Sequence, residues 1–245
     1  MKNTKVISVG GSIIAPDQPD AGFLRDFVNM LGRWLADNDN GELILIAGGG
    51  GPARAYQKAY RDGVEPFIAA GTLIPFTSAK DKNDAADWLG IMATRLNAEL
   101  LRACFGKLAP FPVVTDPTKA PENWHGRVLV AAGWKPGFSS DNDAVLLAEK
   151  YGADTVINLS NIEKVYTDDP KKNPNAKPLD HVSWADFRKM VGDTWEPGKN
   201  TPFDPIASKK AEALGLTVIC ASGRDIENTR LILDGGNFKG TVISN

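Results

Sequence analysis

Short apolar runs alternate along the chain with longer stretches in which apolar residues recur every three or four positions. The short runs are rich in β-branched residues and predict strands. They lie at residues 5–9, 43–47, 111–115, 127–133, 154–160, 217–222 and 240–244. The longer stretches follow the period of a helix. They lie at residues 23–36, 52–61, 84–105, 141–151, 183–191, 204–214 and 225–234.

Strands that are apolar on both faces and separated by helices predict a mostly parallel sheet with helices on both sides. We therefore predict an α/β fold, a three-layer αβα sandwich around a central, mostly parallel sheet. The chain has no internal repeat, low-complexity tract or interdomain linker, which indicates one domain over residues 1–245. The Pro-rich stretch at 168–178 is then a surface excursion within that domain.

Composition limits the function without changing this fold. The 245 residues are 42% hydrophobic and 24% charged with a net charge of −2, which argues against a protein held on nucleic acid by bulk charge. With no Cys-x-x-Cys and only two histidines, His125 and His181, a structural zinc site is not expected. We expect Cys104 and Cys220 to pack as small buried apolar side chains.

No apolar run approaches the roughly 18 residues of a membrane-spanning helix. The apolar start is broken by Gly10, Gly11 and Ser12, and Pro16 follows, so it resembles a signal peptide only superficially. We therefore expect a cytoplasmic protein with neither a membrane nor a nucleic acid as partner.

Glycine, serine and charged residues follow several of the predicted strands. The segments are GGS at 10–12, GGGGPAR at 48–54, GWKPGFSSDND at 133–143 and SNIEKVYTDD at 160–169. In an open parallel sheet, ligands bind beyond the carboxyl ends of the strands, so these segments meet at one rim. Glycines let backbone N–H groups point at an anion, and a helix opening on Pro52 adds partial positive charge. Glycine after a strand can also form a plain tight turn, but two such turns beside Arg54 and several carboxylates favour a phosphate site.

The common nucleotide and acyl-transfer fingerprints are missing from the sequence. GGGGPAR lacks the G-x-x-x-x-G-K-[ST] pattern of a P-loop, and no Rossmann G-x-G-x-x-G is followed by an acidic residue on the next strand. The chain also has no G-x-S-x-G elbow, and neither histidine has an evident serine partner. A redox dinucleotide enzyme and an acyl transferase are therefore disfavoured.

Six motifs are distributed over residues 9–216: VGGSIIAPDQPD, AGGGGPARAY, DWLGIMATRLNAELL, GWKPGFSSDNDAVLLAEKYGAD, LSNIEKVYTDDPKKNPNAKP and DPIASKKAEALGL. In this order and spacing the chain resembles the amino-acid kinase superfamily, and within it the UMP (uridylate) kinases of archaeal type. The most discriminating motif is D-x-x-G-x-x-x-T-R-x-N-A at 87–98. A helical core stripe accounts for its apolar residues, but it does not account for Asp87, Thr94, Arg95 and Asn97 together.

The resemblance implies transfer of the ATP γ-phosphoryl group to UMP, giving UDP in pyrimidine nucleotide biosynthesis, by direct in-line transfer with substrate-bound Mg²⁺. It also implies an acceptor lobe over about residues 1–150, an ATP lobe over about residues 151–245, and a homo-oligomer, a hexamer built as a trimer of dimers. Two alternatives stay open. One is a superfamily kinase with another acceptor, such as carbamate or a small phosphate ester. The other is a non-catalytic homologue that binds or stores nucleotides or oxyanions.

The resemblance carries site residues over by position, and none of them is a direct metal ligand. The implied catalytic residues are Asp141, Arg54 and Lys209. The residues implied to bind UMP, with Asp87 on the ribose, are Gly49, Asp87, Gly133, Trp134, Lys135, Pro136, Gly137, Phe138, Ser139 and Ser140. The residues implied to bind ATP are Gly11, Ser12, Gly50, Arg54, Ser160, Tyr166, Asp169 and Asp204.

Two positions depart from the usual family pattern. Ser8 stands where many relatives carry a lysine two residues before the first glycine of the opening turn. Lysine is the usual point charge for a transferring phosphoryl group, and Lys135 in the acceptor loop could contribute charge instead. NIEKVY, with Glu163 and Lys164, stands where relatives usually read NVDGVY, so a charged side chain replaces glycine in the local turn.

Overall fold

A computed structural model describes residues 3–70, 79–194 and 201–245 of the chain. Seven strands within these ranges form one sheet in the order β3-β2-β1-β4-β8-β9-β7. The strands are β1 (Asn3–Val9), β2 (Gly41–Ala47), β3 (Val128–Ala131), β4 (Thr155–Ser160), β7 (His181–Ser183), β8 (Thr217–Ser222) and β9 (Thr241–Ser244). All neighbours pair in parallel except β8 and β9, which are antiparallel.

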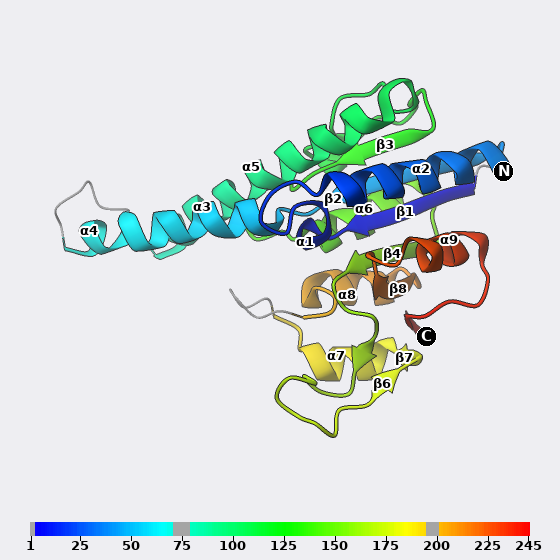
Figure 1. Cartoon of the computed structure of the whole chain (residues 1–245). Coiled ribbons are helices and arrows are strands. Elements are labelled where there is room, and N and C mark those ends of the chain that lie inside the picture. The colour runs from blue at the N-terminus through cyan, green and yellow to red at the C-terminus, as the bar shows by residue number, and fades with distance from the viewer. Residues whose placement is uncertain (1–2, 71–78, 195–200) are drawn as a thin grey trace.

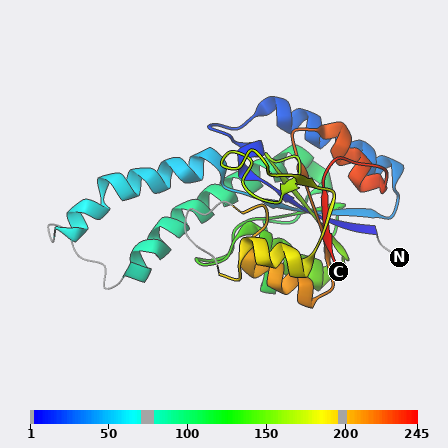
Figure 2. The ribbon, with the colours of Figure 1, turned by 90° about the horizontal axis from the view of Figure 1, so that it is seen from below.

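Helices cover both faces of the sheet, because alternate residues of the central strands enter two different cores (Figures 1 and 2). In β2, for example, Ile44 and Ile46 enter one core while Leu43 and Leu45 enter the other. The first core includes side chains of α6 (Ser140–Tyr151), α7 (Trp184–Val191) and α8 (Pro205–Ala213). The second includes side chains of α2 (Ala21–Asp37), α5 (Ala79–Phe105) and α9 (Ile226–Asp234). The predicted three-layer α/β sandwich with a mostly parallel sheet is confirmed.

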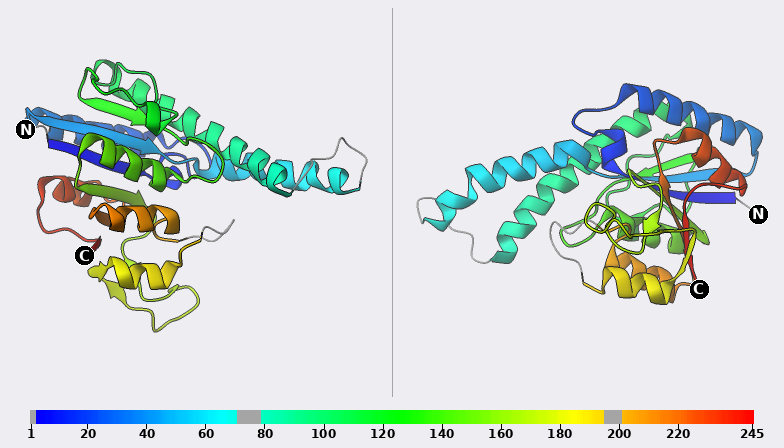
Figure 3. Two further views of the ribbon diagram at one scale, coloured as in Figure 1. Left: turned by 180° about the vertical axis from the view of Figure 1, so that it is seen from behind. Right: turned by 60° about the horizontal axis from the view of Figure 1, so that its bottom comes forward.

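Shorter elements join these layers. They are α1 (Gly11–Ile14), α4 (Glu65–Ala69), the 3₁₀ turns η1 (Gly106–Leu108) and η2 (Pro117–Lys119), and a small antiparallel pair formed by β5 (Val165–Tyr166) and β6 (Pro178–Leu179). The helix α3 (Gly50–Gly63) packs along α5, and the two extend together beyond the sheet (Figures 1 and 3). None of the described helices combines the length and the apolar character needed to span a membrane.

The predicted strand at 111–115 is wrong. Only Val114 pairs there, in an isolated bridge with Ala131, through bonds from its N–H to Val130 O and from Ala132 N to its carbonyl, both 2.9 Å. Pro112 has no N–H to donate, so a continuous ladder cannot form across this segment.

Other predicted boundaries also shift. The strand predicted at 127–133 is shorter, and the helix predicted from residue 52 begins at Gly50, so Pro52 is its third residue. Cys220 is buried as predicted, whereas Cys104 is exposed. The prediction for Cys104 fails because α5 turns Leu101 and Phe105 into the core and leaves the adjacent position facing outward.

Candidate active site

A cavity of about 780 Å³ lies at the carboxyl ends of β1 and β4. One wall is the turn Gly10–Ser12, and the other is formed largely by the segment that leaves β4, residues 160–171. Met190, Val191 and Pro202 add apolar surface to it. Apolar lining next to a glycine turn suits a planar ring with a polyphosphate tail.

Two helices at this rim begin without a side-chain cap. Five other helices begin with a side-chain cap: an aspartate or serine just before the helix accepts a hydrogen bond from a backbone N–H of the first turn. These helices are α2, α6, α7, α8 and α9. In contrast, α1 and α3 begin after Gly10 and Gly49, which have no side chain to offer. The first N–H groups of a helix have no acceptor within it. At the start of α3 the Gly51 N–H donates to the Ala15 carbonyl at 2.8 Å and Pro52 has no N–H, so the Gly50 N–H is the donor that this N-terminus offers to an anion, beside those at the start of α1.

The four consecutive glycines pack against the protein's own backbone. A Cβ on Gly48 or Gly50 would overlap backbone atoms of Gly11, and a Cβ on Gly51 would overlap the carbonyl of Pro16. Gly50 also has a φ of +66°, in the left-handed region that favours glycine. The two glycine turns are therefore interlocked, and this close approach brings the N-termini of α1 and α3 together.

Two guanidinium groups hold Ser12 from opposite sides of the opening turn. Arg54, on α3, donates to the Ser12 hydroxyl (3.2 Å) and to the Pro16 carbonyl (3.0 Å). Arg224, in the loop after β8, donates to the Ser12 carbonyl (3.2 Å) and pairs with Asp20 at 2.6 Å. These arginines add positive charge beside the uncapped helix N-termini.

The motif at 87–98 ties two loops to α5. The side-chain amide of Asn97 donates to the carbonyls of Gly48 (2.8 Å) and Gly49 (3.2 Å). Thr94 accepts from the Gly133 N–H at 2.8 Å, and Asp87 accepts from the Gly137 N–H at 3.2 Å. One helix therefore fixes the distance between the four-glycine turn and the loop at 133–139.

Arg95 completes these tethers. It donates to the carbonyl of Trp134 at 3.0 Å and more weakly to that of Gly133 at 3.4 Å. The loop itself presents a cation between two rings. The Lys135 ammonium lies 3.8 Å from the Trp134 ring centre and 4.9 Å from that of Phe138. The aromatic faces orient this charge at the loop.

Two aspartates, Asp141 and Asp204, lie close together near β1. Asp141 accepts from the Ser8 hydroxyl at 3.2 Å and from the Asp204 N–H at 3.1 Å. The pKa of the Asp141 carboxyl is raised to about 7, chiefly by burial and then by the nearby Asp204 carboxylate, while both hydrogen bonds oppose the rise. The serine at the position where lysine is usual therefore bonds to the acidic residue implied to lie near the phosphates.

Asp143 is a second buried carboxyl in this region. One of its oxygens accepts from the Trp134 N–H at 3.2 Å, and the other has no hydrogen-bond partner in the described part of the chain. Burial raises its pKa to about 7, with further contributions from the carboxylates of Asp141 and Asp116. Asp143 thus ties the start of α6 to the loop at 133–139.

The residues expected at the site fall into two groups in space. The residues that line the cavity are Gly11, Ser12, Ser160, Tyr166 and Asp169. The residues that form or hold the loop at 133–139 and the start of α6 are Asp87, Gly133, Trp134, Lys135, Pro136, Gly137, Phe138, Ser139 and Ser140. Ser139 also caps α6 by accepting from the Asn142 N–H. Gly49 and Gly50, at the start of α3, lie between these groups.

Lys209 stands apart from both groups. It is exposed on α8, and the described residues show no contact between it and the cavity wall or the loop at 133–139. Arg224 was missed by the sequence reasoning. The rule that ligands bind beyond the carboxyl ends of parallel strands could have found Arg224, because it follows Gly223 directly after the predicted strand at 217–222. Asp143 lies in the segment 133–143, which the same rule includes, but the sequence does not show that its carboxylate bonds the Trp134 N–H.

Comparison with known proteins gives one consistent result. The model of the Amino acid kinase family matches residues 3–222. A uridylate kinase from Methanospirillum hungatei is 35% identical over 246 residues, covering 98% of this chain and 94% of that protein. A uridylate kinase from Pyrococcus abyssi is 35% identical over 209 residues, 83% of each chain. The crystal structure of uridylate kinase from Archaeoglobus fulgidus superposes with a TM-score of 0.77 at 29% identity over the full length of both chains.

Proposed function

The chain belongs to the amino acid kinase family, and from this premise we propose that it is a uridylate kinase, which transfers the γ-phosphoryl group of ATP to UMP to give UDP. The observation that carries the proposal is the double tether of α5, in which Asn97 holds the four-glycine turn while Asp87 and Thr94 hold the loop at 133–139. A kinase needs such a rigid link because donor and acceptor phosphates must meet at a fixed distance.

The reaction is a direct displacement. An oxygen of the UMP phosphate attacks the γ-phosphorus of ATP, the new O–P bond forms, and the bond from the γ-phosphorus to the bridging oxygen breaks, with ADP leaving. No covalent enzyme intermediate is required, so the protein acts by positioning and by neutralising charge.

In this proposal the cavity binds ATP. The turn Gly10–Ser12 and the start of α3 at Gly50 surround its phosphates, with Arg54 beside them. Ser160, Tyr166 and Asp169 contact the base and ribose. Asp204 belongs to the same lobe, over about residues 151–245, where it caps α8 by accepting from the Ala207 N–H at 2.8 Å.

UMP binds on the other side of the four-glycine turn, within the lobe of about residues 1–150. Asp87 contacts the ribose hydroxyls, Gly49 the nucleotide, and the segment from Gly133 to Ser140 wraps the uridine and its phosphate. Lys135, held between two rings, supplies a positive charge on this side.

Asp141 joins the two lobes, since Ser8 lies on β1 and Asp204 begins the turn into α8. Lys209, one turn into α8, acts on the transferring phosphate if α8 moves toward the rim when substrates bind. Mg²⁺, when bound with ATP, would supply charge neutralisation at the phosphate oxygens. Within the described ranges no three His, Cys, Asp or Glu side chains converge as a metal cage. Ligation mainly by ATP oxygens and water fits this donor set.

We also propose that the protein works in the cytoplasm as a hexamer, a trimer of dimers. Large apolar side chains remain exposed along the projecting helices, including Tyr56 (63% exposed) on α3 and Met92 (56%) and Leu96 (71%) on α5. Exposed apolar surface of this kind is typical of an interface between subunits.

The test is a coupled assay with purified protein, MgATP and a panel of acceptors: UMP, CMP, carbamate and isopentenyl phosphate. We expect kcat/KM for UMP to exceed that for every other acceptor by at least about tenfold, a difference of about 1.4 kcal/mol in transition-state stabilisation. Turnover with another acceptor and none with UMP would overturn the uridylate kinase proposal. Binding of ATP without turnover of any acceptor would instead support a non-catalytic homologue.

A further inference from the structure

The segment at 160–171, which forms one wall of the cavity, has little structure of its own. Its regular part is β5, two residues that pair with β6. Most of its side chains beyond Tyr166 are exposed. A segment with few packed side chains takes its position from contacts made elsewhere in the fold.

Thr241, at the start of β9, provides the central contact. Its side chain is fully buried. Its hydroxyl accepts from the Val165 N–H at 2.8 Å and donates to the Leu179 carbonyl at 2.5 Å, so one hydroxyl joins both strands of the β5–β6 pair to the main sheet. Removing it would leave the buried Val165 N–H and the partly buried Leu179 carbonyl without this partner, and an unpaired buried N–H is costly in a protein interior.

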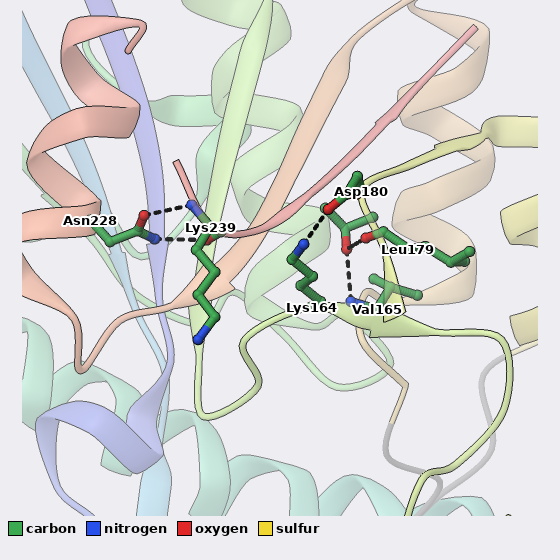
Figure 4. Close-up of polar contacts among 7 residues, drawn as sticks. Lys164, Val165, Leu179, Asp180, Asn228 and Lys239 are labelled. Carbon is green, nitrogen blue, oxygen red and sulfur yellow. Dashed lines mark hydrogen bonds and ion pairs between the residues drawn. The ribbon is translucent and has the colours of Figure 1, made fainter. Parts of the chain in front are cut away.

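Ion pairs lie on either side of this contact. Lys164 pairs with Asp180, and Figure 4 shows its ammonium directed toward that carboxylate. Glu163 pairs with Lys239 at 2.8 Å. The backbone of Lys239 is held in turn by Asn228, whose side chain bonds both its N–H and its carbonyl at 2.7 Å (Figure 4).

The three consecutive residues 163–165 are therefore each fastened to a segment outside the wall. Glu163 and Val165 attach to residues 239 and 241, and Lys164 attaches to residue 180. Glu163 and Lys164 are the two residues that replace the usual Asp-Gly of the family motif. In this chain their charges form pairs with partners outside the cavity lining.

We propose that Thr241, with the flanking pairs Lys164–Asp180 and Glu163–Lys239, positions the cavity wall and so sets the affinity for ATP, without Thr241 touching the nucleotide. The inference rests on the proposed function in that the cavity is taken as the ATP site. Thr241 lies outside the cavity lining and acts through the backbone of Val165, next to Tyr166. It is a positioning residue for the donor and has no part in holding the acceptor.

The test compares Thr241→Val, which has nearly the same shape but no hydroxyl, with Thr241→Ser, which keeps it. We expect Thr241→Val to raise KM for ATP about tenfold, with kcat and KM for UMP within about twofold of wild type, and Thr241→Ser to restore KM for ATP. The matched control is Thr229→Val, because Thr229 is equally buried and, among the described residues, its hydroxyl bonds to the carbonyl of Asp225, the residue that caps its own helix α9. An unchanged KM for ATP in Thr241→Val, or an equal rise in both KM values, overturns the inference.

A second variant covers the case in which Thr241→Val does not fold. Asp180 is exposed and lies outside the cavity lining, so Asp180→Asn removes the partner of Lys164 without changing a residue that lines the cavity. We expect KM for ATP to rise about two- to threefold, as suits an ion pair whose carboxylate is exposed, and the difference to shrink in high salt. Asp26→Asn, which breaks the exposed pair with Arg25 on α2, is the control. No rise in KM for Asp180→Asn counts against the inference.

Direct titration with ATP by calorimetry separates the two claims. Wild-type protein that binds no ATP would overturn the proposed function. Wild-type protein that binds ATP, with Thr241→Val binding equally well, would overturn the positioning role alone.

Discussion

Polar side chains at single positions of α5 act on the backbone of glycine-rich loops. Asn97, Thr94 and Asp87 each bond a peptide group of one of these loops. A loop rich in glycine loses much conformational entropy when it becomes ordered, so such bonds are needed to hold it in one conformation. The motif at 87–98 thus stabilises these loops even when no substrate is bound.

Asp87→Ala tests the acceptor side of this arrangement. Loss of the carboxylate frees the Gly137 N–H and removes the proposed ribose contact. We expect KM for UMP to rise at least about tenfold, with KM for ATP within about twofold, in steady-state kinetics. Asp62→Ala, which removes an exposed carboxylate paired with Lys58 on α3, serves as the control. An unchanged KM for UMP would refute the role of Asp87.

Asp143→Asn tests the buried carboxyl. The pKa of Asp143 is raised to about 7 from 3.8, chiefly by burial. Between these two values the folded protein keeps a proton that the unfolded chain has released. The free energy of unfolding therefore falls as the pH rises through this window. We expect Asp143→Asn to reduce the fall between pH 5 and pH 8 by about 2 kcal/mol, measured by urea unfolding at fixed protein concentration.

The control for this measurement is Asp186→Asn. Hydrogen bonds from Lys189 and Ser183 lower the pKa of that exposed carboxyl, so its stabilising effect is lost only at pH values below its ordinary range. The slope between pH 5 and pH 8 stays as in wild type for Asp186→Asn. If the free energy of unfolding of Asp143→Asn also changed with pH as it does in wild type, Asp143 would titrate like an ordinary exposed aspartate, contrary to this prediction.

At the scale of secondary-structure elements, the start of α3 depends on a backbone crossing. The four glycines bring α3 against α1 so closely that side chains on Gly48, Gly50 or Gly51 would overlap the neighbouring backbone. The lack of side chains at these positions thus permits a close contact within the protein, and this contact places two uncapped helix N-termini together.

Gly50→Ala tests this crossing. The φ of +66° is unfavourable for alanine, and the new Cβ would overlap the carbonyls of Gly11 and Ala15. We expect the free energy of unfolding to drop by at least about 2 kcal/mol and ATP affinity to fall with it. The control is Gly63→Ala in the same helix, where a Cβ meets nothing within 4 Å and alanine stabilises by about 0.5–1 kcal/mol. Equal free energies of unfolding of the two variants, measured by urea unfolding, would contradict the claim that the close backbone contacts require glycine at position 50.

Most elements could be predicted from hydrophobic periodicity, including the strand at 217–222 with the boundaries seen in the structure. The failures have local causes. Pro112 interrupts the predicted strand at 111–115, and the antiparallel direction of β9 leaves no mark on its own sequence. The glycine turns were found as rim segments because each follows an apolar strand. The partners of those glycines were not found, because they lie about 40 residues away in the chain.

At the scale of the whole molecule, α3 and α5 project from the sheet and expose apolar side chains to solvent. Trp88, Met92 and Leu96 are spaced by four residues along α5 and so lie on one stripe. A stripe of this kind on a projecting helix is the surface through which we propose that subunits associate.

The double variant Met92→Glu, Leu96→Glu tests this association. Charges buried in an interface without partners are costly, so we expect the molar mass measured by light scattering after size-exclusion chromatography to fall below that of wild type. Leu231→Glu, an exposed position on α9 (45%), is the control. A wild-type protein that runs as a monomer would show the hexamer proposal to be wrong.

The sequence by itself determined the layers, the mostly parallel sheet, the rim at the strand ends and the family. The alternation of apolar runs is a local property of the sequence, and the meeting of segments at the strand ends follows from the topology of a parallel sheet. Neither depends on which side chains are in contact. Only the tertiary structure decided which groups meet there. It pairs Ser8 with Asp141 across 133 residues and Val165 with Thr241 across 76. Such pairs depend on strand register and helix packing, which are set by the summed burial of both cores and are not encoded near either residue.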